Sequence, residues 1–199
     1  LKSVNQYYNK QMAKRRSICE RMNGRHSSKR IARLTAKWNR KVEDYLHKAS
    51  RKVIDLCAGQ DVSVLVIGKN KGWKQEANLG RKLNQSFVQL PFARFIQMLQ
   101  YKAESIGMKV VLTEESYTSG TSFLDDEAPV KACYDKSRRV HRGLFLASDG
   151  RKINADVNGA YQIMRKVFPN VNADGIEGVA LRPAVVTLSM SARRGSGCA

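Results

Sequence analysis

Acidic side chains that could take part in metal-dependent chemistry stand at two places in the sequence, each at the end of an expected element. Glu114 and Glu115 follow an apolar stretch at 110–112, and Asp156 opens a helical pattern that begins near residue 155. Hydrolysis of a phosphodiester bond on divalent metal ions requires carboxylates from different elements that aim at one point. Element ends suit such carboxylates, because an unpaired charge buried inside a core is strongly unfavourable.

Each of these acids also has a plain structural interpretation. Asp156 near the start of a helix would interact favourably with the helix dipole, which is the commoner role for an acid there. Two Glu residues that close a strand are usually just solvated. Because side chains alternate along a strand, only one of Glu114 and Glu115 can face a given site. Composition and spacing alone therefore predict suitable acid positions and no particular activity.

The sequence is strongly basic. Its 199 residues include 36 Lys plus Arg against 17 Asp plus Glu, which gives a formal net charge of +19 and a pI near 10.1. Such a surplus favours a polyanionic partner, most often nucleic acid. Residues 1–59 hold 16 of the basic and 4 of the acidic residues. The cations there that we expect to contact a phosphate backbone are Lys10, Arg15, Arg16, Arg30, Arg33, Lys37, Arg40 and Lys41.

A second basic cluster lies in the polar stretch after residue 68. Lys71 and Lys74 could hold phosphate, and the indole of Trp73 could stack on a base. Packing of Trp73 beneath its own loop is an equally reasonable interpretation of the same residues.

Apolar runs and cysteine spacing argue against several classes of protein. Runs such as 64–67 are too short to cross a bilayer, and the opening residues carry no secretory signal. The four cysteines, at 19, 57, 133 and 198, form no CxxC pair, so their spacing supports neither a zinc knuckle nor a redox dithiol. We expect reduced thiols in a cytoplasmic protein that associates with the nucleoid.

Hydrophobic periodicity predicts basic helices followed by an α/β core. Breaks near Asn23-Gly24 and Ser27-Ser28 divide residues 1–59 into two antiparallel helices or one broken helix. The further elements expected are strands at 62–67 and 110–112, a helix from Pro91 to about Gly107, a hairpin around 148–150 and a helix from about 155 to 168. The apolar helix faces should run from Val42 to Leu56, from Phe95 to Ile106 and from Val157 to Val167. The expected domains are a basic helical segment at 1–59, a core at 60–169 and a disordered tail at 170–199.

Three stretches carry a resemblance to a known family. They are residues 64–75, the Tyr-Thr-Ser phrase within 112–119 and the Asp-Val-Asn-Gly-Ala phrase within 153–163. In wording and order they resemble the C-terminal half of the TnpB (OrfB) proteins of insertion sequences, over most of residues 1–169. Those proteins are RuvC-like, RNA-guided DNA nucleases related to type V CRISPR effectors. The resemblance implies an RNase H-like α/β fold, Mg²⁺ or Mn²⁺ as cofactor, and DNA with a transposon-encoded guide RNA as partners.

The resemblance also implies three catalytic acids, and two of them have counterparts here. Asp156 matches the acid on the last helix. Gly68 stands where the family usually has a Glu, and some branches carry a displaced Glu one strand later. Glu115, three residues before Thr118, fits that position best, with Glu114 as the runner-up. Glu115 and Asp156 are thus the expected Mg²⁺ ligands, and the first Asp would lie on a strand before residue 1. We therefore expect an incomplete RuvC-like core that lacks its first strands and is inactive alone.

Two features depart from the family pattern. TnpB proteins commonly carry two CxxC pairs in the stretch that corresponds to 116–152, but 119–124 and 145–150 contain no cysteine here. We therefore expect a degenerate zinc-finger insertion without zinc. The phrase around Asp55 superficially resembles the one that carries the first catalytic Asp, but its apolar residues continue the helical pattern from Val42.

The sequence thus predicts the C-terminal, RuvC-like part of a transposon-associated, RNA-guided DNA endonuclease. The alternative is a catalytically inactive nucleic-acid-binding remnant or truncated product. A ribosomal-type RNA-binding protein would account for the charge but not for the Tyr-Thr-Ser and Asp-Val-Asn-Gly phrases.

Overall fold

The computed structural model describes residues 1–70, 91–141, 143–173 and 188. The chain divides into two compact units. Unit 1 contains the described residues 1–61, 91–106 and 188, and unit 2 contains 62–70, 107–141 and 143–173. Of the tail expected to be disordered, 174–187 and 189–199 lie outside the described residues.

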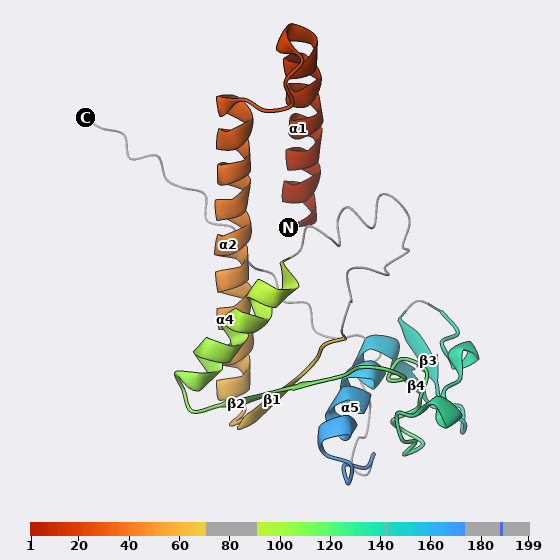
Figure 1. The fold of residues 1–199 in the computed structure, drawn as a ribbon. Coiled ribbons are helices and arrows are strands. Elements are labelled where there is room, and N and C mark those ends of the chain that lie inside the picture. The colour runs from red at the N-terminus through yellow and green to blue at the C-terminus, as the bar shows by residue number, and fades with distance from the viewer. Residues whose placement is uncertain (71–90, 142, 174–187, 189–199) are drawn as a thin grey trace. The chain divides into compact units, whose positions relative to one another are not determined.

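Unit 1 consists of three helices, which are α1 (Lys2–Asn23), α2 (Lys29–Ala58) and α4 (Phe92–Glu104). Gly24 ends α1 in the left-handed conformation, with a φ of 65°, which a glycine adopts without strain. The hydroxyl of Ser28 then caps α2 by accepting a hydrogen bond from the Ile31 amide. These two caps separate α1 from α2, and the helices run antiparallel (Figure 1), which decides between the two arrangements that the sequence left open.

Polar and aromatic side chains join α1 to α2. The indole N–H of Trp38 donates to the buried Asn5 amide oxygen at 2.9 Å. The ring of Tyr8 stacks on Trp38, with 4.6 Å between ring centroids, and the Tyr8 hydroxyl lies 3.1 Å from that of Thr35. The two helices are therefore held in one register near the start of α1.

Helices α2 and α4 meet through apolar side chains. Val42, Leu46 and Met98 form the buried cluster, against which Leu1, Trp38 and Phe95 pack. The apolar face of α2 differs from the expected one, because Ile54 is 1% exposed whereas Leu56 is 45% exposed. Helix α2 continues to Ala58, so the phrase around Asp55 is helical as expected.

The structure groups α4 with the basic helices, whereas the sequence division placed it in the core at 60–169. Arg94 of α4 pairs with Glu43 of α2 at 3.0 Å, and the buried Lys102 ammonium donates to Ser50 Oγ at 2.7 Å. Burial of Lys102, followed by the nearby Arg51 charge, lowers its pKa, although Asp55 acts in the opposite sense. Ile106, expected on the buried face of this helix, is exposed, because α4 ends at Glu104.

Unit 2 contains two small sheets and one α-helix among its described residues. Strands β1 (Val64–Gly68) and β2 (Lys109–Thr113) pair in parallel, with Val64 opposite Lys109 and Gly68 opposite Thr113. Strands β3 (Leu144–Leu146) and β4 (Lys152–Asn154) form the expected antiparallel hairpin, and α5 (Ala155–Val167) follows directly. Two short 3₁₀ helices, η1 (Lys131–Cys133) and η2 (Lys136–Arg138), lie in the irregular stretch before the hairpin.

The core of unit 2 lies between the hairpin and α5. Leu124, Phe145, Ala147, Ile153 and Ala155 form the buried cluster, with Val157 and Tyr161 packed against it. The fully buried ring of Phe123 stacks on Tyr161, with 4.6 Å between centroids.

The buried face of α5 is polar where the sequence pattern predicted apolar residues. Asn158, Gln162 and Arg165 are buried on it, whereas Ala160 is exposed. The reason is the segment opposite, residues 121–127, whose backbone groups form no helix or strand and must find hydrogen-bond partners elsewhere. Side chains of α5 supply those partners.

Candidate functional site

Glu115 follows β2 at the edge where both parallel strands end, and its main chain is held on two sides. Its amide donates to Asn70 Oδ1 at 3.0 Å, and its carbonyl accepts from the buried Thr118 hydroxyl at 2.8 Å. Tyr117 between them adopts a φ of 63°, which turns the chain sharply at this point. The Thr of the Tyr-Thr-Ser phrase thus anchors the acid that stands three residues before it.

The Glu115 side chain packs against Gly68, the last residue of β1. A β-carbon at position 68 would lie 3.0 Å from Glu115 Oε2 and 2.9 Å from Ile163 Cδ1 of α5. These distances are shorter than ordinary van der Waals contacts, so a side chain at position 68 would force Glu115 or Ile163 to shift. Glu114 is exposed and Glu115 half-buried, and it is Glu115 whose side chain lies against β1 and α5.

Asp156 lies in the first turn of α5. Asn154 caps this helix, because its side-chain oxygen accepts hydrogen bonds from the amides of Asp156 and Val157. The Asp156 carboxylate is therefore not the cap; it is 84% exposed and pairs with Arg139 at 3.5 Å. The cap leaves this carboxylate on the surface of unit 2.

Helix geometry relates the two acids. Asp156 and Ile163 are two turns apart on α5, so they share one face and are separated by about 10 Å along the helix axis. Glu115 and Ile163 both lie beside Gly68, so Glu115 is nearer the Ile163 end of that face than the Asp156 end. Within the described ranges, no three His, Cys, Asp or Glu side chains gather as a potential metal site. The carboxylates of Glu115 and Asp156 are nevertheless the hard oxygen donors that Mg²⁺ prefers.

The cations expected to contact nucleic acid lie on α1 and α2. Arg30, Arg33, Lys37, Arg40 and Lys41 are exposed and share one face of α2, because Arg33, Lys37 and Arg40 follow at steps of three or four residues and Lys41 lies one turn after Lys37. On α1, Lys10 and Arg16 are exposed and Arg15 is half-buried. No ion pair with an acidic side chain is recorded for these eight cations within the part of the chain that the structure describes. Lys71, Trp73 and Lys74 lie outside the described residues.

Polar contacts connect the two loops of the stretch expected to be a degenerate zinc finger. The Asp125 carboxylate accepts hydrogen bonds from the Ser148 amide at 2.9 Å and the Ser148 hydroxyl at 2.7 Å. Arg138 bridges Asp125 and Glu127, at 3.3 and 2.7 Å. Burial raises the pKa of Asp125, but the hydrogen bonds from Ser148 and Ser122 and the charge of Arg138 outweigh burial and hold it below its ordinary value.

Sequence reasoning missed the positioning role of Asn158, within the Asp-Val-Asn-Gly-Ala phrase. This fully buried amide accepts from the Phe123 N–H at 2.9 Å and donates to the Thr121 carbonyl at 2.8 Å. The guanidinium group of Arg165 donates further hydrogen bonds to the carbonyls of Glu127 and Val171. The only sequence signal was a polar residue recurring at helical spacing within an otherwise apolar helix pattern.

Three comparisons relate the chain to known proteins. The family model OrfB_IS605, described as a probable transposase, matches residues 1–74, and the Cas12f1-like TNB domain matches residues 92–163. The CRISPR-associated endodeoxyribonuclease Cas12f2 of Micrarchaeota archaeon (strain CG1_02_47_40) is 25% identical over 162 residues, which are 77% of this chain and 28% of that protein. The chain thus spans about a quarter of the length of this curated relative.

A structural comparison supports the fold. The cryo-EM structure of a Cas12f1–sgRNA–target DNA complex contains a chain similar to this one, with a TM-score of 0.54 and 21% identity. The match covers 79% of this chain and 40% of that chain. It confirms an α/β fold of the Cas12 kind, whereas the RuvC core remains a prediction. No helix within the described residues is long and apolar enough to cross a membrane. The two family models match successive parts of the sequence and the archaeal relative matches most of it, so the chain is similar to proteins of the TnpB and Cas12f kind.

Proposed function

We propose that this chain is the RuvC-like part of a transposon-associated, RNA-guided endonuclease that hydrolyses DNA phosphodiester bonds with a divalent metal ion. The observation that carries the proposal is the packing of the Glu115 carboxylate beside Gly68. A side chain at position 68 would project into the space that this carboxylate takes. Glu115 thus offers, from the end of β2, an acid at the place where TnpB proteins usually carry one at the end of β1.

The proposed partners are DNA and a transposon-encoded guide RNA. The net charge of +19 and the cationic face of α2 support a polyanionic partner. In RNA-guided effectors, base pairing with the guide selects the sequence, while protein cations hold the heteroduplex by its shape and charge. The related Cas12f1 structure contains both an sgRNA and a target DNA.

Glu115 and Asp156 would hold Mg²⁺ or Mn²⁺ in this proposal. When bound, such an ion supplies an activated water and neutralises charge on the leaving oxygen. The chain's own contribution is positional: Asn70 and Thr118 hold the Glu115 backbone, and the Asn154 cap leaves the Asp156 carboxylate on the surface.

The test uses the natural protein that contains this chain, loaded with its guide RNA and mixed with target DNA and Mg²⁺. We expect Asp156→Ala and Glu115→Gln each to slow cleavage by about two orders of magnitude, while target binding stays unchanged. Glu114→Gln is the matched control. The Glu114 side chain is exposed, and the variant protein should cleave target DNA at the parental rate. Parental cleavage by Asp156→Ala would overturn the assignment of that residue, and equal cleavage by the two Glu variants would end the displaced-acid proposal.

Gly68→Ala tests the same geometry without removing an acid. The added methyl group would meet Ile163 and Glu115 at about 3 Å, so the Glu115 carboxylate must move. Slower cleavage with unchanged target binding is expected. Gly159→Ala is the control, because nothing lies within 4 Å of a β-carbon there.

A nucleic-acid-binding module without catalysis is the second candidate. The ion pair between Asp156 and Arg139 favours it, because a cation already partners one of the two acids. The same variants decide between the candidates: a binding module would hold target DNA with no cleavage that depends on Asp156 or Glu115.

A further inference from the structure

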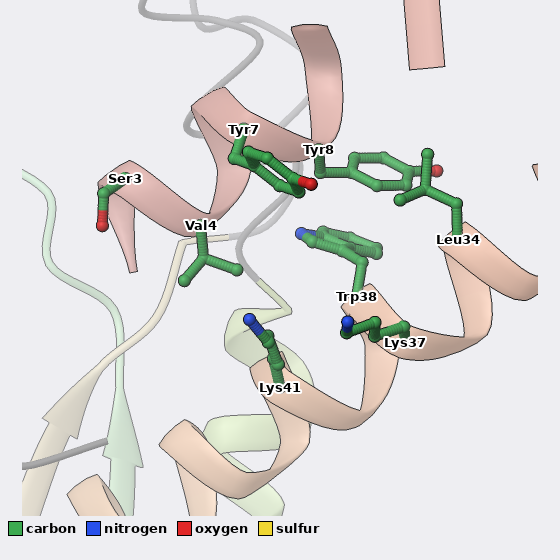
Figure 2. Close-up of a pocket in the computed structure, with 8 residues that line it drawn as sticks. All are labelled: Ser3, Val4, Tyr7, Tyr8, Leu34, Lys37, Trp38 and Lys41. Carbon is green, nitrogen blue, oxygen red and sulfur yellow. The ribbon is translucent and has the colours of Figure 1, made fainter. Parts of the chain in front are cut away.

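We propose that unit 1 carries a slot for one unpaired nucleotide of a single strand, in the groove between α1 and α2 (Figure 2). The inference deepens the proposed function, because it names how these helices would hold a strand. The slot is a cavity of about 290 Å³. Its main lining residues are Val4, Tyr7, Leu34, Lys37, Trp38 and Lys41.

Two kinds of aromatic side chain line the slot: rings held by contacts within the protein, and one exposed ring. The Trp38 and Tyr8 rings are fixed, since they stack on each other at 18° and the indole N–H is bonded to Asn5. Tyr7 is 62% exposed, and Figure 2 shows its ring beside that stack. A base could lie against the Tyr7 ring, because stacking on aromatic side chains is how proteins hold single strands without reading sequence.

Two lysines flank the aromatic wall. Lys37 and Lys41 are one turn apart on the same face of α2, next to Trp38, and Figure 2 shows the Lys41 side chain extending toward Val4. Both ammonium groups are exposed, and no ion pair is recorded for either among the described residues. They are therefore available to the phosphates on both sides of a stacked base.

The slot opens into a cationic track along the same two helices. A second cavity of about 450 Å³ shares Tyr7, Leu34 and Lys37 with the slot, and its other lining residues are Arg15, Arg30 and Arg33. A third cavity of about 320 Å³ shares Arg15 and Arg30 with the second and extends to Lys29. The shared residues place the three cavities next to one another along α1 and α2, and together they are called the groove.

Charge selects the occupant of this groove. Its described lining includes six cations and no acidic side chain. The Nε of Arg15 is buried without a hydrogen-bond partner within the described residues, and a phosphate oxygen would supply the missing acceptor. An aromatic slot next to an arginine-lined track matches a chain of bases and phosphates better than an apolar helix or a small neutral ligand.

The experiment uses the whole 199-residue chain with Trp73→Phe, which leaves Trp38 as the single tryptophan. The probes are an unstructured oligoribonucleotide, the DNA of the same sequence and an abasic strand of the same length. We expect both base-containing strands to quench Trp38 fluorescence and the abasic strand to bind without quenching. The strand that binds more tightly, RNA or DNA, identifies which one the slot takes.

Point variants separate stacking from charge. Tyr7→Ala should weaken binding about tenfold, whereas Tyr7→Phe should bind like the parent, because the ring is kept. Tyr101→Ala on α4 is the control for loss of an exposed ring. Lys37→Gln should reduce the slope of log affinity against log salt by about 0.7, and Lys52→Gln, an exposed lysine near the end of α2, should leave it unchanged.

The outcomes separate failure of the slot from failure of the proposed function. Two results together would overturn the slot and leave the proposed function standing. They are salt-dependent binding without a change in Trp38 fluorescence, and parental affinity in Tyr7→Ala. Equal quenching by an acidic peptide such as polyglutamate would also overturn it, because the groove would then recognise charge alone. The cleavage assay of Asp156→Ala does not depend on any of these binding measurements.

Discussion

The contact between α2 and α4 in unit 1 and the contact between α5 and residues 121–127 in unit 2 differ in kind. In unit 1, helices α2 and α4 meet through buried apolar side chains such as Val42, Leu46 and Met98. In unit 2, α5 directs buried polar side chains onto the backbone of the irregular segment at 121–127. The difference follows from the partner: a helix already satisfies most of its own backbone groups, whereas an irregular segment does not.

This comparison explains how each unit can serve its proposed role. Helices joined along an apolar seam leave their other faces for charge, so α1 and α2 can carry a cationic groove. An irregular segment held by specific hydrogen bonds has one arrangement, which fixes how α5 lies against it. Substitutions that exchange the two kinds of contact test the comparison directly.

The largest effect is expected from Asn158→Leu in unit 2. The variant keeps the branched shape of the side chain but leaves the Phe123 amide and the Thr121 carbonyl without their partner, at a cost of about 4 kcal/mol in unfolding free energy. Hydrogen–deuterium exchange, which reports on each unit separately, should show loss of protection in unit 2 alone.

Gln162→Met is the matched control for that variant. Gln162 is equally buried, but its side-chain oxygen has no partner within the described residues, and the Glu127 carbonyl that its amide contacts also accepts from Arg165. Its loss should change stability by less than about 1 kcal/mol. Equal effects of the two substitutions would contradict the hydrogen-bond account of unit 2.

Met98→Ala should weaken unit 1 by about 3 kcal/mol, because this fully buried side chain fills the seam between α2 and α4. Met22→Ala is the control, since Met22 on α1 is exposed. Hydrogen exchange should report the loss in α2 and α4 and spare α5. Equal loss in both units would show that they do not unfold separately.

Acid should weaken unit 2 through Asp125. Its pKa is lower in the folded state, so the stability it contributes is present above the ordinary Asp pKa of about 4 and is lost as the pH falls through the lowered value. Exchange measured from pH 5 to pH 2 should show this loss in unit 2. Asp125→Asn should flatten the dependence; an unchanged pH profile would show that another group carries it.

The smallest effect is expected from Lys102→Met, which replaces the buried cation of unit 1 with an apolar side chain. Stability at pH 7 should change by no more than about 1 kcal/mol, because loss of two hydrogen bonds is offset by loss of a buried charge. The parent, whose Lys102 pKa is lowered, should gain stability as the pH rises from that value toward about 10.4, and the variant should not. Thermal unfolding measured across this pH range checks the prediction, with Lys52→Met as the control variant. An equal rise in stability with pH in Lys102→Met and Lys52→Met would contradict it.

Local sequence patterns were enough to predict the basic character of the chain, most of its helices and strands, and the candidate site residues. The breaks at Gly24 and Ser28, the strand before Gly68 and the helix after Asn154 all follow from short-range patterns and caps. The helical interpretation of the phrase around Asp55 was also correct, because a regular apolar spacing persists through it. Periodicity and capping depend on neighbours within a few residues, so they can be read without coordinates.

Tertiary contacts decided the rest. The Glu115 side chain meets Gly68 from 47 residues away in the sequence, and Asn158 meets Phe123 across 35. The polar face of α5 could not be predicted from spacing, because it depends on which backbone lies opposite. The same holds for the groove beside Trp38, whose walls come from two helices joined only after folding.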